Sequence, residues 1–160
     1  MSHFQITRRL KCSIIMASWS GTNGSVTVNS PIPFDTLTDL QGTAASTVNI
    51  TNNQITLPSG YWWFIKGSPQ SLLEYNDSSV RYAWRDVNTN TQYGRSGFMT
   101  IQIASLRQGG DELACALIDC RSASVTVTLN VEAKYYAATF NTTTANHHAG
   151  ATRALLWRLG

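Results

Sequence analysis

The most obvious candidate metal ligands in the sequence are the adjacent histidines His147 and His148. Adjacent residues of an extended chain point to opposite sides, so both rings reach one ion only if the backbone turns between them. The surrounding stretch, 137–150, contains no carboxylate or cysteine that would complete a ligand set. We therefore interpret the pair as part of a mobile or interface loop, and we predict no metal ion and no other cofactor.

Asp111, Glu112 and Asp119 lie close together in the sequence, and paired carboxylates can act as a general acid and a general base. Such a pair needs nucleophilic or substrate-binding groups around it, and the neighbouring sequence supplies no such constellation of Ser, His or Glu. The Gly-x-Ser-x-Gly motif and glycine-rich phosphate loops are also missing from the sequence. We interpret the carboxylates as turn and strand-end residues and predict that the protein is not an enzyme.

Cys12, Cys115 and Cys120 cannot all pair within one chain, because their number is odd. Cys115 and Cys120 are five residues apart, and on one continuous strand this spacing turns their side chains to opposite faces. The sequence has neither a Cys-x-x-Cys motif nor a cysteine–histidine spacing typical of zinc sites. We therefore predict reduced, packed thiols in a protein that folds in a reducing cytoplasm.

The chain of 160 residues has a formal net charge of +3, and charged residues make up only 13% of it. Its one local basic cluster is formed by Arg8, Arg9 and Lys11, so the composition gives no reason to expect nucleic-acid binding. No stretch approaches the roughly 20 apolar residues that cross a membrane, and the apolar patch 12–17 is too short for a secretory signal. We expect no nucleic-acid or membrane partner. Met16 is an alternative start of translation, which the sequence leaves open.

The strongest structural signal is the stretch 55–65, with the sequence Ile-Thr-Leu-Pro-Ser-Gly-Tyr-Trp-Trp-Phe-Ile. Ile55 and Leu57 alternate with polar residues, as in a strand with one face in water, and a Pro-Ser-Gly turn follows. The run from Tyr61 to Ile65 lacks this alternation, which indicates a strand covered on both faces.

Turn signals divide the rest of the sequence into short segments with the composition of β-strands. We predict further strands at 25–29, 46–50, 54–57, 80–87, 98–103, 111–118, 124–131 and 154–159. Asn52 and Asn53 tolerate the left-handed backbone of a hairpin turn, whereas Phe34, Leu37 and Leu40 suit one helical turn or a loop that plugs the core. The sequence supports no long helix, so we predict an all-β antiparallel sandwich or jelly roll.

Two more apolar runs, 111–118 and 154–159, resemble the run at 61–65 in lacking clear alternation. A small sandwich covers one face of such strands with its own second sheet, and the other face then needs another subunit. We therefore expect these three runs to be neighbours in one inner sheet that mediates self-association. The predicted interface residues are Tyr61, Trp63, Ile65, Leu113, Cys115, Leu117, Leu155 and Trp157.

Residues 55–64 resemble a signature of the C1q/TNF-like jelly rolls, in which a strand, a Pro-x-Gly turn and an inner-sheet strand follow one another. Gly110-Asp111 resembles the turn before another inner strand of that family, and 154–159 resembles its closing strand. The resemblance covers about residues 30–160. It implies a compact homotrimer whose inner-sheet aromatic residues lie close to a three-fold axis.

The sequence has no collagen-like Gly-X-Y stalk, so it is more similar to the bacteriophage branch of this fold than to the complement or cytokine branch. This resemblance implies a non-enzymatic virion protein that is assembled in the host cytoplasm. We expect a trimeric capsid decoration, or cement, protein on the capsid surface. The alternative is the receptor-binding tip of a tail fibre or spike, which would bind host surface glycans.

We predict that residues 1–24 form an N-terminal arm and that 25–160 form the jelly-roll domain. In the arm, Arg8, Arg9, Lys11 and Trp19 are expected to contact the major capsid protein or another virion protein. The glycan alternative would instead use aromatic residues as stacking surfaces. Its candidate residues are Tyr61, Trp62, Trp63, Trp84 and Trp157.

Overall fold

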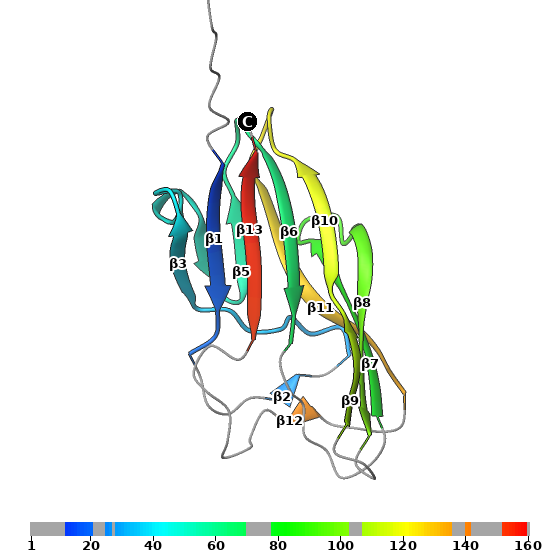
Figure 1. Ribbon diagram of the computed structural model, residues 1–160. Helices are drawn as coiled ribbons and strands as arrows, with labels where there is room; N and C mark the ends of the chain where they lie inside the picture. The colour runs from blue at the N-terminus through cyan, green and yellow to red at the C-terminus, as the bar shows by residue number, and fades with distance from the viewer. Residues whose placement is uncertain are drawn as a thin grey trace, which may run out of the picture.

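The computed structural model describes residues 12–20, 25–26, 28–69, 78–102, 107–135, 140–141 and 152–159. These residues form antiparallel strands and one short 3-10 helix, η1 (Ala45–Thr47), and they include no α-helix. The predicted all-β antiparallel class is therefore confirmed. The strands lie in two facing layers, which we call the front sheet and the back sheet (Figure 1).

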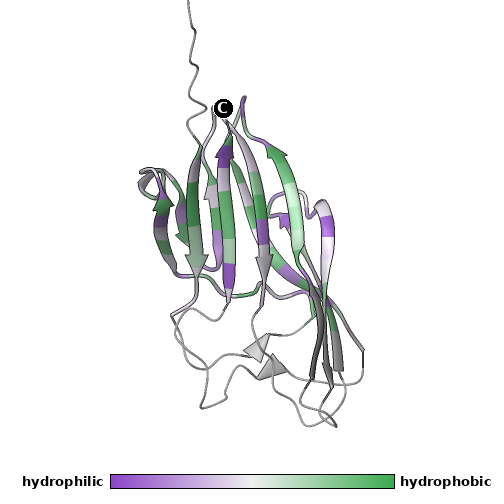
Figure 2. Cartoon of the chain, in the orientation of Figure 1, coloured by the Kyte–Doolittle hydropathy of each residue, from purple (hydrophilic) through white to green (hydrophobic). Residues whose placement is uncertain are grey.

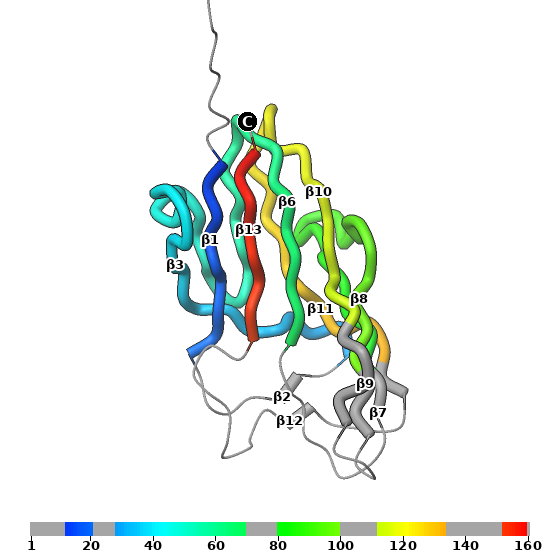
Figure 3. Tube along the Cα trace, viewed as in Figure 1, coloured from blue at the N-terminus to red at the C-terminus, as the bar shows by residue number. Residues whose placement is uncertain are grey.

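The front sheet draws its strands from the beginning, the middle and the end of the chain. In spatial order it consists of β3 (Thr36–Gln41), β1 (Ser13–Ser18), β13 (Arg153–Leu159), β6 (Trp62–Ser68) and β10 (Ala114–Asp119). The first described strand, β1, thus lies beside the last one, β13 (Figure 3). One edge of this sheet is β3, whose one partner among the described strands is β1.

The back sheet contains the longest strands. Its order is β4 (Asn49–Thr51), β5 (Gln54–Leu57), β11 (Val125–Tyr135), β7 (Ser78–Asp86), β8 (Gln92–Gln102) and β9 (Arg107–Glu112). The two sheets are joined where Cys115 of β10 pairs with Arg95 of β8. A separate two-stranded sheet is formed by β2 (Ser25–Val26) and β12 (Phe140–Asn141).

The core lies between the two sheets and follows the period-two alternation of the strands. The largest fully buried side chains are Trp63, Trp84, Tyr82, Phe34, Ile15, Ile32, Ile55, Leu57, Ile65, Met99, Ile118 and Leu129. Trp84 links the layers, because its indole Nε1 donates a hydrogen bond of 3.2 Å to the carbonyl of Ala114 and its ring stacks on Phe34. Buried indole and phenol groups need such partners, since an unpaired polar group in the core is destabilising.

Two strands differ from the sequence-based expectation. Residues 13–18, which were expected in the arm, form β1 in the interior of the front sheet. Their apolar residues alternate, so that Ile15 and Ala17 enter the core. Residues 36–41, which were expected as a helical turn or loop plug, form the edge strand β3.

The predicted run 111–118 is divided between two strands in the structure. β9 ends at Glu112 and pairs with β8, whereas β10 begins at Ala114 and belongs to the front sheet. The other strands predicted between residues 46 and 159 all contain observed strand. Their observed bounds differ by a few residues, most of all in β8, which begins at Gln92.

Gly94 allows the front and back sheets to meet at the junction of β8 and β10. Its φ of +61° lies in the left-handed region, and an added Cβ would come within 2.1 Å of the Cys115 carbonyl oxygen. Only glycine fits here, because both the backbone conformation and the close approach exclude a side chain. Gly60 also has a positive φ, +95°, but a Cβ there would meet no atom within 4 Å.

We predict that Gly94→Ala lowers the free energy of unfolding by at least about 2 kcal/mol, because the side chain collides with the backbone of β10. Gly60→Ala is the matched control, and it should cost only about 1 kcal/mol from the left-handed backbone alone. Chemical denaturation of both variants measures the difference. Equal stability of the two variants would contradict the close packing at this junction.

Candidate functional site

The outer surface of the front sheet, which faces away from the core, carries an apolar row across four neighbouring strands. Strand register places Ile14 of β1 opposite Trp157 of β13, Trp157 opposite Phe64 of β6, and Phe64 opposite Leu117 of β10. The Phe64 and Trp157 rings touch, with centroids 5.3 Å apart. Leu117 is 56% exposed, which is unusual for a leucine within a sheet strand.

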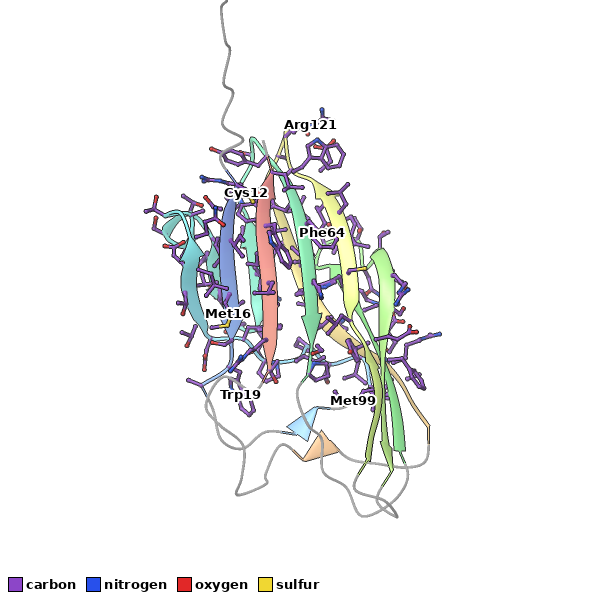
Figure 4. The ribbon with its side chains drawn as sticks, viewed as in Figure 1. Cys12, Met16, Trp19, Phe64, Met99 and Arg121 are labelled. Atoms are coloured by element: carbon purple, nitrogen blue, oxygen red, sulfur yellow. The ribbon has the colours of Figure 1, made fainter. Side chains whose placement is uncertain are left out.

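A second row lies next to the first and continues the surface. It contains Met16, Leu155, Lys66 and Cys115, each paired across the sheet with its neighbour. Beyond the first row, Leu159 and Trp62 extend the apolar surface towards the C-terminal end of β13. We call the ten residues Ile14, Met16, Trp62, Phe64, Lys66, Cys115, Leu117, Leu155, Trp157 and Leu159 the outer face. Met16 and Phe64 mark it in Figure 4, and Figure 2 shows hydrophobic residues along its strands.

The structure divides the predicted interface residues between this face and the core. Cys115, Leu117, Leu155 and Trp157 belong to the outer face. Trp63 and Ile65 point the other way and are fully buried within the single chain. The same period of two that puts Trp63 inside puts its neighbours Trp62 and Phe64 outside.

The two remaining predicted residues lie at the ends of the inner strands. Tyr61 precedes β6 and is half-buried, and the guanidinium of Arg158 lies 4.7 Å above its ring centroid. Leu113 is half-buried between β9 and β10. Neither residue is part of the continuous apolar row.

Sequence reasoning missed six members of the outer face, which are Ile14, Met16, Trp62, Phe64, Lys66 and Leu159. Ile14 and Met16 were missed because residues 13–18 were assigned to the arm. Their alternation with Ile15 and Ala17 was the signal that could have identified a strand with two apolar faces. Trp62 and Phe64 were missed because the odd-numbered residues of the run 61–65 were assigned to the interface, whereas the even-numbered residues face outward.

Of the residues predicted to bind a capsid protein, only Trp19 lies among the described residues. It follows β1 directly, is half-buried, and donates its backbone N–H to the carbonyl of Thr152 at 3.3 Å. Arg8, Arg9 and Lys11 lie outside the described residues, as do His147 and His148.

Exposed ion pairs hold two of the carboxylates that were considered as catalytic candidates. Asp119 accepts hydrogen bonds from Nε and Nη2 of Arg121, and these bonds lower its pKa to about 2. Arg121 also lies over the Trp62 ring, 4.7 Å from its centroid (Figure 4). Glu112 pairs with Arg95 at 3.2 Å. These contacts give the carboxylates structural partners at strand ends, as the sequence suggested.

A polar network on the outer surface of the back sheet was not predicted. The Glu132 side chain is only 4% exposed and lies between Arg85 and Arg81, whose Nε is 3.2 Å from the carboxylate. Ser96 donates a longer hydrogen bond of 3.4 Å to the same carboxylate. The β-bulge of β11 at this position brings Glu132 towards both arginines of β7. The ion pairs and the hydrogen bond thus connect β7, β8 and β11 of the back sheet.

The described residues contain no group of three or more His, Cys, Asp or Glu side chains that could hold a metal ion. They also include no helix that is long and apolar enough to cross a membrane.

No protein-family profile matches the sequence, and comparison with curated proteins finds no relative. The outer face, with its exposed Leu117 and the touching rings of Phe64 and Trp157, is the candidate functional feature of the described surface.

Cys115 and Cys120 should react differently with an alkylating reagent. Cys120 is fully buried, and this burial raises the pKa of its thiol to about 11, so it stays protonated and inaccessible at pH 8. Cys115 lies on the outer face, and we expect iodoacetamide to modify it in the folded single chain but not when that face is covered. Peptide mass spectrometry at high and low protein concentration measures both sites. Modification of Cys120 in the folded protein would contradict this arrangement.

Proposed function

We propose that this protein is a non-enzymatic structural protein that assembles with copies of itself through the outer face. The observation that carries the proposal is the apolar row Ile14–Trp157–Phe64–Leu117, which runs across four strands without a charged residue. Large exposed apolar patches are rare on monomeric proteins and typically mark interaction sites. Covering such side chains contributes about 1.5–3 kcal/mol for each one fully buried.

Within this proposal the fold is a C1q/TNF-like jelly roll and the assembly is a homotrimer. The connections support this assignment, because the chain crosses between the sheets from β5 to β6, from β6 to β7 and from β10 to β11. The segments whose sequences resemble that family are 55–64, 110–118 and 154–159, and their later parts form β6, β10 and β13, which are neighbours in the front sheet. Gly110 and Asp111, expected as a turn, instead lie in β9 of the back sheet. A trimer around these strands would cover the outer face of each copy.

We further propose that the trimer is a bacteriophage capsid decoration protein. Support comes from the low charge, from the sequence rich in Ser, Thr, Asn and Gly, and from the basic residues Arg8, Arg9 and Lys11 that precede β1. These three residues are candidates for contact with the capsid surface. The receptor-binding tip of a tail fibre is the alternative, and both functions use the same self-associating domain.

The self-association claim predicts that Leu117→Asp weakens assembly by more than about tenfold in dissociation constant, because it places a charge in an apolar interface. The fold of the chain should persist, since Leu117 is exposed in one copy. Val28→Asp is the matched control, because Val28 is also an exposed apolar residue, 40% accessible, but lies outside the front sheet. Analytical ultracentrifugation and circular dichroism measure assembly and folding. Equal assembly of both variants would contradict the proposed interface.

The decoration claim predicts that deleting residues 1–11 abolishes binding to phage capsids and leaves the assembly intact. The deletion has to end before Ser13, because β1 lies in the interior of the front sheet. Co-sedimentation with capsids of the encoding phage measures binding, and light scattering measures assembly. Undiminished capsid binding would contradict a role for Arg8, Arg9 and Lys11. Adsorption of the full-length protein to host cells, without capsid binding, would favour the tail-fibre alternative.

A further inference from the structure

Lys66 places a positive charge within the otherwise apolar outer face. Its cross-strand neighbours on that face are Leu155 and Cys115, and Phe64 precedes it on the same side of β6. Lys66 forms no ion pair with any residue that the structure describes. In one copy the ammonium group has access to water, so this arrangement carries no penalty before assembly.

Covering the outer face would remove that water and leave a buried ammonium group, which is strongly unfavourable without a partner. Two copies packed face to face would not supply one. Such packing would bring together two copies of a face whose ten residues include one ammonium group and no carboxylate. Asp119 is the acid at the end of this surface, and it is already paired with Arg121. The charge pattern therefore favours contact between the outer face and a different, acidic surface.

The free edge of the front sheet has the required charge. Asp35 directly precedes β3 and Asp39 lies within it. They are the two charged residues of the sequence between residues 25 and 65, so no basic residue close in sequence offsets them. Asp35 uses both carboxylate oxygens, which accept hydrogen bonds from Ser20, and one of them also accepts a bond from Thr36. The Oδ1 atom of Asp39 accepts the backbone N–H of Ala45 at 2.8 Å, and its other oxygen has no partner among the described residues.

The same edge also offers an apolar side chain. Leu40 follows Asp39 in β3 and is 53% exposed. Among the described strands, β3 pairs with β1 alone, so it is the edge strand of the front sheet. This edge therefore combines an exposed leucine with an unpaired carboxylate oxygen, and the outer face combines an apolar row with an unpaired ammonium group.

We infer that the outer face of one copy packs against the β3 edge of the next copy, with Lys66 paired to Asp39 of that neighbour. This inference rests on the proposed self-association and specifies its geometry. A contact between two different surfaces is heterologous, and repeated around a rotation axis it closes into a ring, as a trimer requires. The ion pair would satisfy the buried charge and fix the register of one copy against the next.

Carbodiimide cross-linking tests this pairing in the native full-length protein. The reagent joins a carboxylate directly to an amine with net loss of water, so it links only groups in contact. Within one chain Lys66 and Asp39 are separated by β13 and β1, which is three strand spacings or about 14 Å, too far for such a link. In a mixture of nitrogen-14 and nitrogen-15 copies, we expect a linked Lys66–Asp39 peptide pair containing both isotopes.

Asp39→Asn is the key variant, because its amide oxygen can still accept the Ala45 N–H while the negative charge is removed. We expect this variant to lose the link and to raise the dissociation constant of the assembly by about tenfold. Lys66→Met should have a similar or smaller effect, and combining it with Asp39→Asn should add little, since the two groups act as one pair. Glu112→Gln is the control, because Glu112 is an exposed carboxylate of β9 in the back sheet, and it should leave the dissociation constant unchanged.

The possible outcomes separate this inference from the proposal on which it rests. A stable assembly in which Lys66 links to another carboxylate, or to none, would overturn the pairing and leave self-association in place. Additive effects of the Asp39 and Lys66 variants would also overturn it. A chain that remains monomeric would overturn both.

Discussion

The architecture depends on the fact that the front sheet has apolar side chains on both of its faces. Inward residues such as Trp63 and Ile65 build the core with the back sheet, and outward residues such as Phe64 and Trp157 form a second apolar surface. The described part of one chain covers only the first of these surfaces. Since exposed apolar area is unfavourable in water, we propose that the second surface is the one through which the folded domain assembles.

The order of strands makes this surface a property of the whole chain. The outer face combines residues of β1, β6, β10 and β13, which are distributed from residue 13 to residue 159. No fragment that lacks either end can form it, because β13 lies between β1 and β6. Long-range pairings of this kind slow folding, because the entropy of loop closure opposes them before their contacts form. The proposed assembly surface therefore becomes complete only when both ends of the chain are in place.

The sequence was sufficient to predict the all-β class, most strands and the position of the run 61–65 in an interior strand of a sheet. It was less informative about which side chains of a strand face the core. A run such as Tyr-Trp-Trp-Phe-Ile is apolar at every position, so its pattern does not distinguish inward from outward residues. Only the register with neighbouring strands decides that Trp63 is inside and Trp62 outside. β1 was missed for a related reason, since its two-sided apolar pattern lies next to basic residues that resemble an arm. The Glu132 network depends on a bulge, which no local pattern indicated.

The most direct test of the central claim is the solution mass of the native full-length chain, measured by sedimentation equilibrium over a wide range of protein concentration. If the outer face is a self-association surface, the mass will converge on three times the chain mass of 17.6 kDa. It will fall towards the single-chain value only on dilution. A mass of one chain at every concentration would contradict the account, because the apolar row would then be stable in water without a partner.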